Sequence, residues 1–327
     1  MLSIVSGEKI KMAKFSFVVP VYNEEHNIPL LYSKIIKAMD TVREEWELIF
    51  VNDGSKDNTS NILKEYSLKD KRIKYISLSR NFGHQSALTA GLDHVSSKTH
   101  AVISLDGDLQ DPPEVIEAMI NKWKEGHDVV YARRKNRHDN FIKKYTAILY
   151  YKILDNFSDV NIPRNVGDFR LIDKKVLENL KEMKEKARYL RGMVAWLGFK
   201  YAFVDFDRPE RIHGNTGYPF QKMLKLAMDG LLNFSFLPLK IGFLLGILSI
   251  SLGMFIMMYM FIDVLFYNVY YPLYKWLVLI LFMFMGFQFI LIWILGEYIA
   301  RIYEESKKRP LYVVKEKVNF NENGENN

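Results

Sequence analysis

Five short apolar runs alternate with stretches of helical periodicity in the N-terminal part of this 327-residue chain. Each run is rich in β-branched or aromatic residues and has the length of a single strand. Strands that alternate with helices predict an α/β fold, in which a mainly parallel sheet carries helices on both faces. The predicted strands span residues 15–21, 48–51, 73–78, 101–105 and 128–131.

Polar residues follow the ends of the first four predicted strands. Right-handed crossovers bring the carboxyl ends of parallel strands to one edge of a sheet, and ligands bind at that edge. We therefore expect the side chains of Glu24, Asp53, Arg80 and Asp106 to line one crevice.

The fourth predicted strand is followed by an acidic segment that contains Asp106, Asp108 and Gln110. Pro112 and Pro113 come next and predict the start of a helix, since proline is tolerated in a first helical turn. Two carboxylates and an amide oxygen suit a hard divalent cation, Mg²⁺ or Mn²⁺, which would bridge a nucleotide diphosphate. The alternative is a solvated acidic turn, because isolated Asp-x-Asp tripeptides are common. The strand before this segment and the helix start after it favour the metal site.

Two long apolar runs, residues 241–266 and 276–295, predict a two-helix transmembrane hairpin. Each run can cross about 30 Å of hydrocarbon at about 1.5 Å per residue. The aromatic link between the runs carries one basic residue, Lys275, whereas both outer flanks are basic. By the positive-inside rule both flanks are cytoplasmic. We therefore expect a multi-pass protein of the plasma (inner) membrane with a cytoplasmic α/β domain.

Two amphipathic segments, residues 140–157 and 219–236, are expected to form helices at the membrane interface, and a core-facing helix is the alternative for the first. The polar, glycine-rich residues 208–218 predict a mobile loop, and residues 165–172 a loop that enters a strand or a helix. The expected divisions are an N-terminal extension (1–14), the α/β domain (15–218), an interface helix (219–236), the hairpin region (237–298) and a cytoplasmic C-terminal tail (299–327).

Charge and cysteine content narrow the classes of partner. The net charge is +7, yet no nucleic-acid-binding motif is visible. The basic residues are dispersed along the chain and cluster only at the outer flanks of the two long apolar runs. Anionic lipid or phosphorylated substrates are therefore favoured over nucleic acid. The chain has no cysteine, which excludes disulfides and thiolate metal sites.

Several segments together resemble those of the family-two glycosyltransferases with a GT-A fold. The closest resemblance is to the bacterial polyprenyl-phosphate glycosyltransferases related to dolichyl-phosphate mannose synthase. Each segment alone is weak evidence for the family, but their number, order and spacing together make the resemblance specific. The segments are residues 19–24, 52–55, 80–85, 106–114, 167–170, 296–298, 301–303 and 309–312.

The resemblance implies that residues 15–218 form a Rossmann-like GT-A domain that binds a nucleotide sugar and a divalent metal, Mg²⁺ or Mn²⁺. The implied nucleotide-binding residues are Pro20, Tyr22, Glu24, Asp53 and Asp106, and the implied metal ligands are Asp106, Asp108 and Gln110.

The resemblance also implies roles for arginines beside these acidic residues. Arg134 would meet phosphate, with Arg133 as the substitute if the register differs by one residue. Arg170 would lie near the acceptor phosphate, and Arg211 would close on the donor diphosphate from an Arg-x-x-Gly loop. The planar guanidinium suits these roles because it pairs with two phosphate oxygens at once. Gly217 departs from the family pattern, which usually has a lysine there.

The implied reaction transfers one sugar, with inversion, from a nucleotide diphosphate sugar to a polyprenyl phosphate. A UDP-sugar and undecaprenyl phosphate are the expected substrates, and the product would serve cell-envelope glycan or glycolipid modification. A phosphate monoester has a second pKa of about 6, so it is already an oxyanion near neutral pH and requires no strong general base. Asp111 or Asp168 is a candidate to orient the acceptor.

Two other functions are compatible with the sequence. The sequence also leaves open whether the protein forms a homo-oligomer. A processive polysaccharide synthase would share the nucleotide site, although its Gln-x-x-Arg-Trp motif is absent and it usually has more membrane spans. A non-catalytic membrane protein that binds nucleotide is the third interpretation, and the acidic pair with Arg170 and Arg211 argues against it.

Overall fold

The computed structural model describes residues 14–135, 162–163, 165–186, 188–207, 251–252, 255–256, 258–263, 265–266 and 272–320. Several predictions concern residues outside this set: the N-terminal extension up to residue 13, the interface helices 140–157 and 219–236, and the glycine-rich segment 208–218 with Arg211 and Gly217.

The elements alternate between strand and helix as far as β5. In chain order they are β1 (Lys14–Val21), α1 (Ile28–Val42), β2 (Glu45–Asn52), α2 (Thr59–Lys69), β3 (Ile73–Leu78), α3 (His84–Asp93), β4 (Ala101–Ser104), the 3-10 helix η1 (Pro113–Val115), α4 (Ile116–Lys124), β5 (Val129–Arg134), β6 (Val166–Asp173), α6 (Lys174–Glu182), α7 (Leu190–Trp196), β7 (Tyr201–Phe206), α10 (Leu273–Ser306) and β8 (Val314–Val318).

The described strands form one eight-stranded sheet in the order β7-β5-β6-β4-β1-β2-β3-β8. β1 pairs in parallel with β2 and β4, β2 with β3, and β5 with β7. β6 is antiparallel to β4 and β5, and β8 is antiparallel to β3. Four of the seven pairings are parallel, which confirms the predicted mainly parallel α/β sheet, and β6 and β8 make this sheet mixed.

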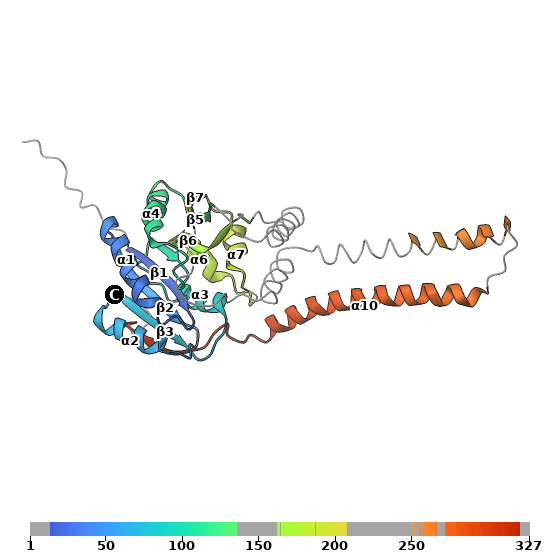
Figure 1. The fold of residues 1–327 in the computed structure, drawn as a ribbon, viewed down its shortest axis with the longest axis horizontal. Helices are drawn as coiled ribbons and strands as arrows, with labels where there is room; N and C mark the ends of the chain where they lie inside the picture. The colour runs from blue at the N-terminus through green and yellow to red at the C-terminus, as the bar shows by residue number, and fades with distance from the viewer. Residues whose placement is uncertain are drawn as a thin grey trace, which may run out of the picture. The chain divides into compact units, whose positions relative to one another are not determined.

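Helices cover both faces of the sheet (Figure 1). Successive side chains of a strand point to opposite faces, and neighbouring residues of β1 accordingly meet different helices. Phe17 lies in one buried apolar cluster with Leu31 and Ile35 of α1. Val18 lies against α3, so close that a Cβ on Gly91 would be 2.2 Å from the Val18 Cγ1 atom. Both helices therefore pack tightly on the strands that lead to the crevice edge.

Residues 310–320, here called the C-terminal strap, return to the sheet and add β8 to its edge. The backbone N–H of Ser79 donates to the carbonyl of Val313 over 2.9 Å. The side-chain amide of Asn319 donates to the carbonyl of Ile73 over 2.7 Å. Part of the predicted C-terminal tail is therefore a strand that pairs with β3.

The chain divides into two compact units. The first contains the sheet and comprises Met1–Thr146, Asn161–Pro219 and Pro310–Asn327; the second comprises Ala147–Val160 and Phe220–Arg309 and contains the 34-residue helix α10. Among the residues that the structure describes, no helix has both the length and the hydropathy that crossing a membrane requires. The hairpin over residues 241–266 and 276–295 therefore stays a prediction.

Candidate active site

Asp106 and Asp108 lie in the loop that leaves β4, at the carboxyl edge of the sheet, as predicted. The carboxylate of Asp111 accepts a hydrogen bond from the backbone N–H of Asp106 over 3.0 Å, and that of Asp108 accepts one from the N–H of Gln110 over 3.1 Å. A Cβ on Gly107 would lie 2.8 Å from the Cγ1 atom of Val21, so the loop lies tightly against the end of β1. These contacts fix the acidic side chains at the crevice.

The carboxylate of Asp106 is buried and incompletely hydrogen-bonded. Its Oδ1 atom is buried and, among the residues that the structure describes, accepts no hydrogen bond; the Nε2 atom of His84 lies 3.5 Å from it. Burial raises the pKa of Asp106, and the carboxylates of Asp168 and Asp108 raise it further. A buried carboxylate beside other carboxylates is a site that a bound cation would stabilise.

The acidic pair therefore fits a divalent cation shared with a diphosphate. Among the described residues, no three histidine, cysteine or carboxylate side chains group as metal ligands. Mg²⁺ sites in nucleotide enzymes commonly use one or two carboxylates and complete the octahedron with phosphate oxygens and water. Asp106 and Asp108 would supply that pair, and Gln110 stays a predicted third ligand.

A carboxylate from another strand, that of Asp168 in β6, lies beside the acidic loop because β6 pairs with β4. Its neighbours are cationic or amide groups: His84 Nε2 at 3.3 Å, Gln85 Nε2 at 3.0 Å, Arg191 Nη2 at 3.3 Å and Arg170 Nη2. Burial alone would raise the pKa of Asp168, but Arg191, His84 and Arg170 hold it well below its usual range. Asp168 is therefore ionised at neutral pH.

His84 begins α3 and joins the two carboxylates. Burial alone would lower the pKa of its imidazole, but Asp106 and Asp168 raise it to about 9. The pKa of the neighbouring Asp111 is also raised, to about 7, by burial and by the carboxylate of Asp106, but here the favoured protonated form is neutral. The site thus contains an imidazolium between carboxylates and a buried acid that titrates near neutrality.

The arginines predicted to meet phosphate differ in their surroundings. Arg170 is 3% exposed and donates to the carbonyl of Leu190 over 3.1 Å as well as to Asp168. Arg134 extends toward the acidic loop, where its charge lowers the pKa of Asp111, whereas Arg133 pairs with Asp205 of β7. Arg134, rather than the substitute Arg133, is therefore the member of this pair near the acidic loop.

The predicted base site is built on Asp53, which follows β2. Its two carboxylate oxygens accept the backbone N–H groups of Phe82 and Gly83, over 2.7 and 2.9 Å, and so hold the loop that follows β3. Gly54 has φ +69°, and a Cβ there would lie 2.6 Å from the carbonyl carbon of Arg80, so this crossing requires glycine. His84 follows Gly83 in the chain, and its Nε2 atom lies 3.5 Å from the carboxylate of Asp106. Asp53 and Asp106 therefore belong to one contiguous site.

The remaining predicted nucleotide residues lie at the end of β1. Pro20 is in the strand, and Tyr22 just beyond it is 40% exposed. The backbone N–H of Glu24 donates to the hydroxyl of Thr59 over 2.9 Å, and its carboxylate accepts from Asn27. These contacts place Glu24 beside the start of α2.

Sequence reasoning did not assign roles to His84, Gln85 and Arg191. The first two follow the third predicted strand within residues 80–85, so their position at a strand end was an available signal. Arg191 gave no local signal, because it reaches Asp168 only through the fold of the chain between α6 and α7.

Comparison with known proteins identifies the family. The profile described as glycosyl transferase family 2 matches residues 16–181. The glycosyltransferase YkcC of Bacillus subtilis is 48% identical over 305 residues, which cover 92% of this chain and 93% of that protein. The prophage bactoprenol glucosyl transferase homolog of Escherichia coli K12 is 41% identical over 304 residues, and the bactoprenol glucosyl transferase of Shigella phage SfV 40% over 303 residues; each match covers 92% of this chain and 98% of the relative.

These matches span almost the whole chain, and the family profile includes the acidic loop and Asp168. The chain belongs to glycosyl transferase family 2, and it is a glycosyltransferase.

Proposed function

We propose that this enzyme transfers a single sugar from a UDP-sugar to a polyprenyl phosphate, with undecaprenyl phosphate as the natural acceptor. The observation that carries this proposal is the near full-length similarity to proteins named bactoprenol glucosyl transferase. The similarity extends through both compact units, so it includes more than the nucleotide-binding part of the fold.

The donor diphosphate would lie over the acidic loop after β4. Asp106 and Asp108 would hold a divalent cation, which, when bound, stabilises charge on the leaving diphosphate. Arg134 on the same side would pair with phosphate oxygens. Asp53 would act near the base by holding residues 82–83, and Tyr22 presents an exposed ring at the end of β1.

The acceptor chemistry matches the state of Asp168. A phosphate monoester needs no deprotonation near neutral pH, so the enzyme's remaining task is to place its oxygen against the anomeric carbon. Asp168 stays ionised and receives donors from three cationic side chains, His84, Arg170 and Arg191. It is therefore suited to holding those cations in place.

Membrane attachment is the second part of the proposal. The apolar runs 241–266 and 276–295 and their basic flanks favour a hairpin in the plasma membrane, with the α/β domain in the cytoplasm. The second run lies within α10, where Leu281 and Trp293 are among the exposed large apolar side chains. A polyprenyl acceptor is confined to the bilayer, so attachment would place enzyme and acceptor on the same surface.

A donor screen tests this function. The purified full-length enzyme is incubated with undecaprenyl phosphate, Mg²⁺ or Mn²⁺, and one radiolabelled donor at a time: UDP-glucose, UDP-galactose or a UDP-N-acetylhexosamine. One donor should label the organic extract, and excess chelator or Asp108→Ala should abolish that label. Asp40→Ala, which removes an exposed carboxylate of α1, is the matched control and should retain activity. Labelling that persists in excess chelator would contradict the metal site, and no labelled lipid with any donor would contradict the function.

A further inference from the structure

The strand order places β1 on one side of β4 and β6 on the other, so the site has a nucleotide side and a β6 side. The residues predicted to bind the base and ribose lie at the ends of β1 and β2, and the acidic pair follows β4. The next strand on the far side of β4 is β6, which carries Asp168. In a single displacement with inversion the acceptor lies opposite the leaving diphosphate, so the acceptor phosphate is expected on the β6 side.

Two arginines contact Asp168 on that side, and their exposures differ. Arg170 is 3% exposed and both of its described hydrogen bonds end on protein atoms. Arg191 is 27% exposed, and its Nη2 and Nε atoms lie 3.3 and 3.4 Å from the two carboxylate oxygens. These distances exceed the roughly 2.7–2.9 Å of a tight charge-assisted hydrogen bond. Arg191 is therefore the arginine of this cluster that an incoming phosphate can reach.

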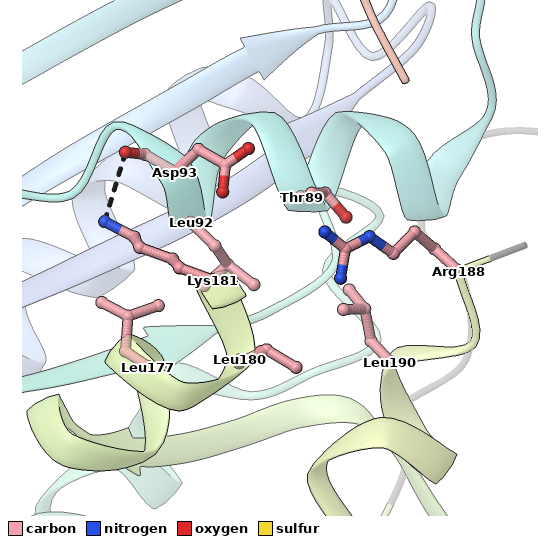
Figure 2. A pocket seen from close by; sticks show the side chains of 8 residues that line it. All are labelled: Thr89, Leu92, Asp93, Leu177, Leu180, Lys181, Arg188 and Leu190. Carbon is pink, nitrogen blue, oxygen red and sulfur yellow. Dashed lines mark hydrogen bonds between the residues drawn. The ribbon is translucent and has the colours of Figure 1, made fainter. Parts of the chain in front are cut away.

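Leu190, the residue before Arg191, is held by two backbone hydrogen bonds and by the packing of its side chain. The backbone N–H of Leu190 donates to the Oε1 atom of Gln85 over 3.1 Å, and its carbonyl accepts from Arg170. Gln85 also donates to Asp168 through Nε2, so one side chain joins Asp168 to the start of α7. Figure 2 shows the Leu190 side chain packed between α3 and α6, near Thr89 and Leu180. The position of Arg191 is therefore set by the same groups that hold Asp168.

We propose that Arg191 binds the phosphate of the lipid acceptor, and that Arg170 and Gln85 are positioning residues that act through Asp168 and Leu190. This inference rests on the proposed function. The phosphate monoester pairs with the exposed side of the guanidinium, while Asp168 holds the other side in the orientation seen here. The role expected for Arg170 from sequence is thereby transferred to Arg191.

The test is a separate measurement of KM for undecaprenyl phosphate and for the sugar donor in the full-length enzyme. Arg191→Ala should raise the KM for the lipid phosphate about tenfold, the usual effect of losing one charge-assisted hydrogen bond, and should change the donor KM less than about twofold. Arg191→Lys should recover part of the loss, because it restores the charge without the planar fork. Arg72→Ala, an exposed arginine paired with Asp70 outside the site, is the control and should change neither value.

Equal increases in both KM values, or a fall in kcat alone, would overturn the assignment to the acceptor. If Arg191→Ala does not fold, Arg191→Lys decides: a selective rise in the lipid KM supports the inference and an unchanged value overturns it. A wild-type enzyme that uses no polyprenyl phosphate would overturn the proposed function and this inference with it. An active wild type with unchanged KM in the variants would overturn this inference alone.

Discussion

Asp168 is a buried charged residue in β6, a strand whose sequence does not distinguish it from a loop or a helix. It and Arg170 are both almost fully buried in β6, and they are tolerated there because each is the other's partner. A buried pair of this kind is weak evidence for stability as a whole, yet removing Asp168 leaves the charge of Arg170 buried without its carboxylate, and removing Arg170 takes from Asp168 one of its three cationic neighbours. The two residues are therefore expected to be sensitive to substitution for reasons of folding as well as of chemistry.

Arg170→Ala should destabilise the α/β domain by about 1.5–3 kcal/mol, because Asp168 would lose its most buried cationic partner while His84 and Arg191 remain beside it. Thermal or denaturant unfolding of the purified protein measures this change. Arg133→Ala removes the exposed arginine paired with Asp205 and should cost far less. Equal losses in the two variants would show that Arg170 has no special structural role.

Glu47 provides a test of pH dependence outside the active site. It is buried in β2 and pairs with Lys74 and Lys14 over 3.0 and 2.9 Å. Burial alone would raise its pKa, but Lys74, a hydrogen bond from Ser16 and Lys14 together lower it below the ordinary 4.5. A lowered folded pKa stabilises the protein above the unfolded pKa, and this contribution disappears as the pH falls through the folded value.

Glu47→Gln should therefore be less stable than the wild type at pH 7, and the difference should shrink as the pH falls below about 4.5. The free energy of unfolding of both proteins, measured from pH 7 to pH 3, gives this comparison. A difference that stays constant over this range would mean that the charge of Glu47 contributes nothing.

At the scale of elements, the C-terminal strap connects the sheet edge to the nucleotide side of the crevice. Val313 accepts a hydrogen bond from Ser79, the residue that leaves β3 toward the loop held by Asp53. Tyr312 donates to the carboxylate of Asp93 at the end of α3 over 2.9 Å. The strap therefore supports both ends of the segment between β3 and the end of α3.

A chain truncated before Pro310 should show a KM for the nucleotide sugar several-fold higher than the wild type and a lower Tm, because β3 would become an unpaired edge and Ser79 would lose its acceptor. Truncation after Phe320 removes only residues 321–327 and serves as the matched control, with activity and Tm retained. Equal donor KM values for the two truncated chains would show that the strap does not support the nucleotide site.

The sequence predicts β1 to β5 because each contains a continuous apolar run that is buried in the sheet. β6 escapes that pattern, since Asp168 and Arg170 interrupt its apolar residues and are neutralised only by tertiary contacts. β8 reads as Val-Lys-Glu-Lys-Val, the charged alternation of an edge strand, which resembles a solvated tail. The acidic loop was predictable from its place after a strand, whereas the contact between Arg191 and Asp168 depends on the path of the chain between β6 and α7.

At the scale of the whole molecule, the proposed topology places both termini in the cytoplasm and the link between the apolar runs outside. The cysteine-free chain allows a direct test with single cysteines at Asn268 and Asn323. A membrane-impermeant thiol reagent applied to intact cells should label the cysteine at position 268 and spare the one at position 323 until the cells are lysed. Labelling of position 323 in intact cells would overturn the proposed topology.

The central claim is that one sugar is transferred to a lipid phosphate, and the most direct measurement compares undecaprenyl phosphate with undecaprenol as acceptors and determines the product mass. The alcohol lacks the charge that Arg191 would bind and needs a base to deprotonate it, whereas the phosphate is already an oxyanion at neutral pH. We predict a product of one sugar on undecaprenyl phosphate and little turnover of undecaprenol. Equal turnover of the two acceptors, or a ladder of products with several sugars, would contradict the account.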